Sequence, residues 1–322
     1  MSLEQPISRE NAPERFEKRG KEVRIVLKFQ RHGLREGTVL TDEGRQITRD
    51  LAEKSGWHVV GEDQNAHEEG AFNAAKSIGS AADTPEKTAE NPHPLSRALE
   101  TANITARTVA GERAGTWHPR PEARLNYKSV QTPAPYDHLP MYNAALEQAM
   151  RDLGSGKTKL ADLTKEEKVK VTEQAQTEVV RHVSSLNTPE ADVWKAEAAG
   201  MFADLIEHYT DMTRHLDNNA KVLYVAGTHG GTVEWLLQKA LVWTDEHGNV
   251  KTGYESPDEI GGAFQSSDAY NVNIETNEKG ELQEIKVTFD DPKRTQLVRD
   301  AHFDLNTLNE LAKQYKELHH DS

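Results

Sequence analysis

Two apolar segments far apart in the chain have the pattern of buried β-strands. In residues 23–29, apolar side chains alternate with polar ones, and Val26 adds apolar character to the opposite face. Residues 222–226 form a continuous apolar run, which is typical of a strand covered on both faces. Each strand leads into a loop that contains a histidine, and a helical pattern follows.

Apolar residues recur at helical spacing in several other parts of the chain. Thr41 suits the N-cap of a helix that continues through Ile47 and Leu51, and two acidic residues suit its first turn. The aromatic and methionine stripe of residues 194–216 indicates a long helix packed on the core. The same spacing predicts further helices that begin near Ser96 or cover residues 143–153, about 163–186, 233–241 and 305–315.

An alternating segment at 270–274, a turn at 277–280 and a returning segment at 282–289 predict a β-hairpin. We expect this hairpin to be antiparallel and to lie at the edge of the sheet. Weaker signals predict a helix over residues 70–78 and a polar loop over 81–92. They also predict a short strand within residues 120–127.

The chain has no internal repeat and no domain-scale linker, so we expect one elaborated domain over residues 21–322 after a flexible leader at 1–20. Segments at about 58–94 and 127–194 are interpreted as insertions into this domain. We expect them to form a wall or cap that sets substrate choice. Candidate residues lining it are Tyr127, Tyr136 and Tyr142.

Composition excludes several classes of protein. The net charge of −14 and the lack of a dense Lys/Arg run argue against nucleic-acid binding. No run approaches the roughly 20 apolar residues of a membrane span, and no apolar signal region is visible near the start. Without cysteine there are no disulfides or thiolate zinc sites, which fits a cytoplasmic location. The 14 histidines are scattered without metal-ligand spacing, so we expect no metal and no cofactor.

Three separated segments carry groups suited to binding an anion. Arg31, His32 and Gly33 follow the first strand, where ligands sit in open α/β sheets. Arg97 lies in the first turn of a helix, where a positive charge opposes the helix dipole unless it meets an anion. His229 precedes two glycines whose backbone N–H groups can point at an anion.

With these motifs in order, the chain resembles the histidine phosphatase superfamily, the phosphoglycerate-mutase-like proteins. That family carries Arg-His-Gly after its first strand, an arginine at an Arg-Ala-x-x-Thr-Ala helix start and a late His-Gly. Here these are Arg31-His32-Gly33, Arg97-Ala98 with Thr101-Ala102, and His229-Gly230. The resemblance implies an α/β fold of three layers, with a mostly parallel sheet, helices on both faces and an edge hairpin.

The resemblance and the chemistry agree on a phosphate site. A phosphomonoester dianion needs several fixed positive donors, and the planar fork of arginine meets phosphate oxygens in pairs. We expect Arg31, Arg35 and Arg97 to form that clamp. The motif Arg-His-Gly-x-Arg, which includes Arg35, resembles the acid-phosphatase branch of the family. The two glycines after His229 resemble the mutase branch instead. Because the two motifs point to different branches, Arg35 fits a surface position as well as a phosphate ligand.

His32 is the expected nucleophile. Nearby guanidinium charges disfavour imidazolium, and a backbone carbonyl, such as that of Gly33, would hold the other ring nitrogen as a donor. A phosphohistidine would form on His32, and water would hydrolyse it. His229 and Gly230 would hold the phosphoryl group during the transfer.

The proton donor for the leaving group is not evident. The mutase branch carries a Leu-Asn-Glu segment, but here Tyr127 stands where that glutamate would be. The acid-phosphatase branch places an acid directly after the second histidine, where this chain has Gly230. Asp137 is the first candidate and Glu122 the second, and a substrate with a good leaving group needs neither.

The leading hypothesis is a metal-independent phosphatase that hydrolyses small phosphomonoesters through His32. A phosphoglycerate mutase-type phosphotransferase is an alternative enzyme, which the missing acid disfavours. A non-catalytic module that binds a phosphorylated ligand is an alternative of another class. The sequence identifies neither the substrate nor the oligomeric state.

Overall fold

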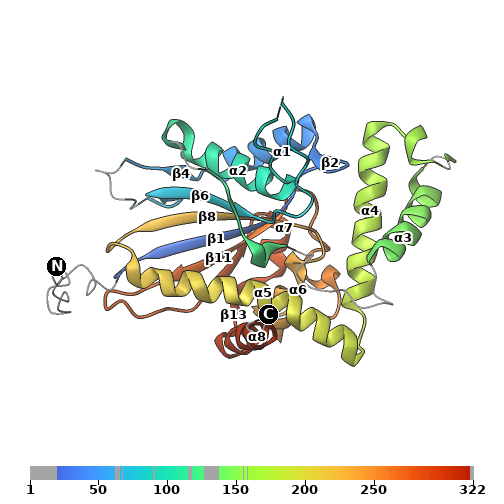
Figure 1. Ribbon diagram of the computed structural model, residues 1–322. Coiled ribbons are helices and arrows are strands. Elements are labelled where there is room, and N and C mark those ends of the chain that lie inside the picture. The colour runs from blue at the N-terminus through green and yellow to red at the C-terminus, as the bar shows by residue number, and fades with distance from the viewer. Residues whose placement is uncertain are drawn as a thin grey trace, which may run out of the picture.

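The computed structural model describes residues 20–61, 66, 68–89, 91–114, 118–126, 138–154, 156–157 and 159–319 (Figure 1). Residues 1–19 of the expected leader lie outside these residues, as do Tyr127, Tyr136 and Asp137. Among the described residues, no helix has both the length and the apolar composition needed to cross a bilayer.

A nine-stranded mixed sheet forms the middle of the molecule (Figure 1). Its order is β10-β9-β13-β12-β11-β1-β8-β6-β7. The parallel part consists of β1 (Arg24–Arg31), β8 (Lys221–Thr228), β6 (Ala74–Gly79) and β7 (Arg120–Pro121). The antiparallel part consists of β11 (Ala269–Glu275), β12 (Lys286–Phe289), β13 (Arg299–Phe303), β9 (Leu241–Thr244) and β10 (Val250–Thr252).

The expectation of a mostly parallel sheet is therefore wrong, since three adjacent pairs are parallel and five are antiparallel. The hairpin of β11 and β12 is also not at the edge, because β11 pairs directly with β1. The asparagines that alternate with apolar residues along β11 are buried and paired: Asn271 donates to Asp290, and Asn273 accepts from Arg24.

Helices cover both faces of the sheet, as expected for an α/β fold (Figure 1). On one face, α2 (Arg97–Ala110) packs on β6 and β8 and contacts α1 (Asp42–Lys54), which Thr41 caps as predicted. On the other face, α5 (Pro189–Met212), α6 (Val233–Ala240) and α8 (Leu305–His319) belong to the larger core. A short helix, α7 (Pro292–Leu297), follows β12.

Two further helices, α3 (His138–Leu153) and α4 (Lys165–Ser184), pack together beside the sheet and share a small core of their own (Figure 1). They fall within the segment predicted to cap the site. The remaining strands form two short pairs, β2 (Arg35–Glu36) with β3 (Val39–Leu40) and β4 (His58–Val59) with β5 (Ala71–Phe72).

The helix expected over residues 70–78 is wrong, since these residues form β5 and β6. Alanine favours helices in isolation, but tertiary packing overrides that preference here. β6 lies between β8 and β7 and directly beneath α2, where small residues allow the helix to approach. A Cβ on Gly79 would lie 2.9 Å from the Cα of Leu99.

Gly227 in β8 permits a second close approach of α2. A Cβ at this position would lie 2.0 Å from the carbonyl oxygen of Ala98, which is backbone and cannot rotate away. We expect Gly227→Ala to lower the free energy of unfolding by about 3 kcal/mol, because α2 must move off the sheet. Urea denaturation would measure the loss of stability. An unchanged denaturation midpoint would show that α2 does not pack closely against this strand at Gly227.

Candidate active site

The carboxyl ends of β1 and β8 place the two predicted histidines side by side. The strands pair in parallel register, Arg31 opposite Thr228, and the backbone N–H of His32 donates to the carbonyl of Thr228 at 2.9 Å. The ring centroids of His32 and His229 lie 5.3 Å apart, with their planes at 68°. Arg31, His32, Arg97 and His229 are each at most 7% exposed, so the sequence motifs meet in one buried cluster.

His32 is held in a defined tautomer. Its Nδ1 lies 2.9 Å from the carbonyl oxygen of Gly33, the bond that we expected from the sequence. A carbonyl oxygen only accepts, so Nδ1 carries the hydrogen and Nε2 keeps its lone pair. The loop itself is fixed to α2, because Gly33 N donates to Thr101 Oγ1 at 3.0 Å and Thr101 donates to the carbonyl of Arg97 at 2.8 Å.

The surroundings of His32 also keep its ring neutral. Burial, followed by the charges of His229, Arg31 and Arg97, lowers the pKa of His32 well below 6.5, and the hydrogen bond to Gly33 only partly opposes this. A neutral imidazole with a free Nε2 is the form that can attack phosphorus.

This lowered pKa makes a prediction about stability. Below about pH 6.5 the unfolded chain protonates this histidine while the folded chain does not, so stability falls as the pH falls. We expect the His32→Asn variant to lose less stability than the wild type between about pH 7 and pH 5, by up to about 1.4 kcal/mol per pH unit. Urea titrations at a series of pH values measure the difference; parallel curves for the two proteins would contradict it.

Arg97 and His229 contact each other directly. Arg97 Nη2 lies 3.4 Å from His229 Nδ1, and His229 Nε2 lies 3.1 Å from the hydroxyl of Ser80. Because arginine only donates, Nδ1 accepts here and Nε2 carries the hydrogen toward Ser80. The same Nη2 forms an ion pair with Asp83 Oδ2 at 3.2 Å.

Arg31 is anchored at one end of its guanidinium group. Its Nη1 donates to the carbonyl of Phe264 at 2.6 Å and to Glu173 Oε2 at 2.8 Å. Its Nε is buried and has no hydrogen-bond acceptor among the described residues. A Cβ on Gly230 would lie 2.7 Å from that Nε, so a glycine is needed where the loop of His229 packs against Arg31. A buried donor without an acceptor is the feature expected of an anion site.

Arg35 lies at the rim. It is exposed, and its Nη1 donates to the carbonyl of Gly37 at 3.1 Å. Arg97 Nη1 lies 3.5 Å from the same carbonyl, so the two guanidinium groups approach each other from the exposed and the buried side. Arg35 can therefore meet the outer part of a ligand, while Arg31 and Arg97 face its buried end.

The cap segment contributes Glu173, which sequence reasoning missed, and Tyr142, which it named as a candidate lining residue. From α4, Glu173 binds Arg31 and also accepts from the hydroxyl of Ser266. From α3, Tyr142 lies close enough for its pKa to respond to the site: burial raises it, and the charges of Arg35 and Arg31 partly oppose the rise. No local sequence signal marks Glu173, which lies in a heavily charged helix.

Glu234 is a second residue that the sequence did not indicate. It is fully buried in the first turn of α6, and its carboxylate accepts from Gly231 N at 3.0 Å and Phe264 N at 3.2 Å. Burial raises its pKa, and the charge of Arg31 partly opposes that. Glu234 thus ties the loop of His229 to the loop that anchors Arg31.

Glu122, the second candidate acid, has partners of its own. It forms two side-chain hydrogen bonds with Arg124, at 2.9 Å and 3.1 Å, and Arg124 also binds Asp204. Although burial acts to raise it, the hydrogen bonds and charge of Arg124 hold the pKa of Glu122 below its usual range. The arginine that Glu122 binds is not one of the cluster residues, so Glu122 is less well placed than a carboxylate that contacts Arg31 or Arg97. Asp137 lies outside the described residues.

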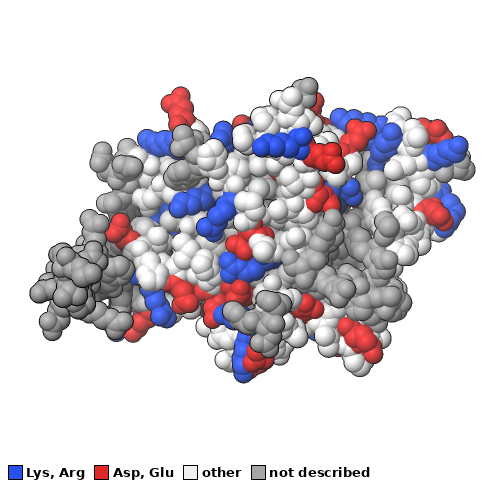
Figure 2. Space-filling view, viewed as in Figure 1, with Lys and Arg blue, Asp and Glu red and all other residues white. Residues whose placement is uncertain are grey.

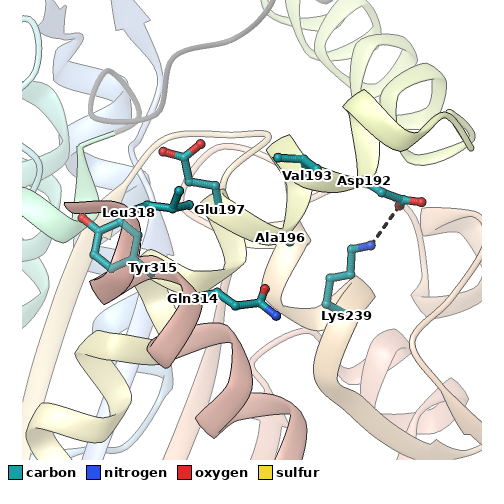
Figure 3. A pocket seen from close by; sticks show the side chains of 8 residues that line it. All are labelled: Asp192, Val193, Ala196, Glu197, Lys239, Gln314, Tyr315 and Leu318. Carbon is teal, nitrogen blue, oxygen red and sulfur yellow. Dashed lines mark hydrogen bonds and ion pairs between the residues drawn. The ribbon is translucent and has the colours of Figure 1, made fainter. Parts of the chain in front are cut away.

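A separate surface hollow of about 370 Å³ lies between α5, α6 and α8 (Figure 3). No residue of the histidine cluster lines it; its lining residues are Asp192, Val193, Ala196, Glu197, Lys239, Gln314, Tyr315 and Leu318. Among the described residues, no group of three or more His, Asp or Glu side chains is placed to hold a metal ion. On the face drawn in Figure 2, basic and acidic side chains are interspersed.

No model of a known protein family and no curated protein matches the sequence. Solved structures with a similar course of the chain include the phytase from D. castellii, at 10% identity and a TM-score of 0.40, covering 90% of this chain and 79% of that one. Another is a mycobacterial glucosyl-3-phosphoglycerate phosphatase, at 15% identity and a TM-score of 0.31, covering 82% of this chain and 96% of that one. Both belong to the histidine phosphatase superfamily, which the motifs resemble. The likeness is too distant to transfer either protein's activity to this chain.

Proposed function

We propose that this chain is a phosphatase that hydrolyses small phosphomonoesters through a phosphohistidine on His32. One observation carries the proposal: a neutral histidine with a free Nε2 lies beside a second histidine and two buried guanidinium groups. This is the set of groups that phosphoryl transfer to nitrogen requires, because positioning and charge stabilisation supply nearly all of the catalysis.

In the first step, the lone pair of His32 Nε2 attacks phosphorus in line with the leaving oxygen. Arg31, through Nε and its remaining Nη2, and Arg97 would bind the equatorial phosphoryl oxygens, on which negative charge resides in the transition state. His229 would hold Arg97 in this cradle, because its Nδ1 accepts from Arg97 Nη2. Water then attacks the phosphohistidine on the same axis and releases inorganic phosphate.

The positive charge in this scheme comes from the guanidinium groups of Arg31 and Arg97, so we expect phosphate release to continue in excess EDTA. The decisive experiment is a rapid alkaline quench after mixing the protein with a phosphomonoester labelled at phosphorus, since the P–N bond of phosphohistidine survives alkali. Label on His32 that appears before free phosphate supports the proposal. A module that only binds phosphorylated ligands would retain no covalent label, and a mutase would return the label to a second hydroxyl group of its substrate.

A further inference from the structure

A short turn after β6 brings a carboxylate to the edge of the histidine cluster. Asp83 lies in this turn with φ at +59°, in the left-handed region that Asp and Asn tolerate better than most residues. The turn is closed by bonds from Thr84 N and Thr84 Oγ1 to the carbonyl of Ala81, at 3.3 Å and 2.7 Å. Ala82 N also donates to the hydroxyl of Ser80 at 3.1 Å.

This turn is attached to the site at its base. The Ser80 hydroxyl that receives Ala82 N is the same one that meets His229 Nε2 at 3.1 Å. Ser80 is fully buried, and its carbonyl accepts from Ser96, the N-cap of α2. The position of Asp83 is therefore fixed to His229 on one side and to the start of the Arg97 helix on the other. Strained backbone held this firmly is typical of functional sites.

Asp83 is separated from the phosphate site by a single guanidinium nitrogen. Its Oδ2 lies 3.2 Å from Arg97 Nη2, which also lies 3.4 Å from His229 Nδ1. A phosphoryl group bound to Arg97 would place an oxygen next to this carboxyl group.

We propose that Asp83 is the proton donor to the leaving group, the acid that the sequence left unassigned. This assignment rests on the proposed phosphatase function. As His32 Nε2 bonds to phosphorus, the bond between phosphorus and the ester oxygen breaks, and its electron pair stays on that oxygen. The carboxyl proton of Asp83 moves to that oxygen and gives an alcohol. Asp83, now a carboxylate, takes a proton from the attacking water, and the P–N electron pair returns to Nε2.

Substrate binding supplies the change of protonation that this role requires. Without ligand, Arg97 stabilises the ionised form of Asp83. A bound phosphoester dianion shares Arg97 and adds like charge next to the carboxylate, which favours protonation of one of the two anions.

Glu173, the carboxylate that binds Arg31, is less suited to this role. Both oxygens of Glu173 have partners of their own, Arg31 on one and the Ser266 hydroxyl on the other. Glu173 also contacts Nη1 of Arg31, which the Phe264 carbonyl already anchors, and not the unpaired Nε. Its position fits attachment of α4 to the site, and it provides a matched control.

The test compares two substrates with Asp83→Asn and Glu173→Gln. An alkyl phosphate needs its leaving oxygen protonated, whereas p-nitrophenyl phosphate releases a stabilised phenolate that does not. We expect Asp83→Asn to lower kcat/KM for the alkyl phosphate about 10²–10³-fold and that for p-nitrophenyl phosphate less than about fivefold. Asparagine accepts the same left-handed backbone, so the turn is retained. Glu173→Gln should change both substrates by the same factor.

Equal losses on both substrates in Asp83→Asn would overturn the assignment, because a residue that only orders Arg97 does not distinguish leaving groups. No loss on either substrate would overturn it as well. If the wild type hydrolyses neither substrate and forms no phosphohistidine, the proposed function itself fails. Turnover of p-nitrophenyl phosphate by Asp83→Asn through labelled His32 would leave that function intact whatever the result for Asp83.

Discussion

Replacing His32 by alanine is expected to abolish phosphatase turnover, with a loss of about 10⁴-fold or more in kcat. No other described side chain in the cluster combines a ring nitrogen in its free-base form with a hydrogen bond that fixes its tautomer. His229 does not substitute, because its Nδ1 faces Arg97 and its Nε2 faces Ser80. Covalent label should disappear together with turnover.

This variant should still bind phosphate, because Arg31 and Arg97 keep their other partners. Competition of inorganic phosphate with a fluorescent phosphate analogue would check that the site is formed. His247→Ala is the matched control, since that histidine is 75% exposed and remote from the cluster in sequence and structure. Residual turnover of His32→Ala above about 1% of the wild-type rate would exclude His32 as the nucleophile.

The main part of the site could be predicted because it is encoded locally. His32 and His229 each follow an apolar strand, and Arg97 lies at a helix start marked by a serine N-cap, so short patterns identify all three. Parallel pairing of β1 with β8 then brings them together without further information. Similar local patterns identified α1 and α5.

The rest depends on contacts between distant segments. The sequence of β6 resembles a helix in isolation because it is short and rich in alanine. It forms a strand because it pairs with β8 and packs against α2. The alternating asparagines of β11 suggested an edge, and only their long-range partners explain how they are buried. Asp83 and Glu173 lie in polar stretches where any acidic residue is unremarkable. Their importance appears only once Arg97 and Arg31 are seen beside them.

Arg97→Ala should show the second largest loss, about 10²–10⁴-fold in kcat/KM. Each charge-assisted hydrogen bond contributes about 1.5–3 kcal/mol, and a buried guanidinium can make two to one phosphoryl group. The substitution also leaves Asp83 and His229 without the cation that lies between them. Arg97→Lys should recover little, because a single ammonium cannot reproduce the planar fork.

Arg35→Ala is the matched comparison, since both arginines reach the carbonyl of Gly37 and only one is buried. Water screens the exposed Arg35, so its loss should raise KM by less than about tenfold and leave kcat nearly unchanged. Steady-state kinetics on one phosphomonoester distinguish the roles of Arg97 and Arg35. Loss of a group that acts in the transition state lowers kcat, whereas loss of a group that only attracts the ligand does not. If Arg35→Ala lowered kcat as far as Arg97→Ala, the phosphoryl group would bind at the exposed rim, and the buried cluster of His32, Arg31 and His229 would not be the reaction centre.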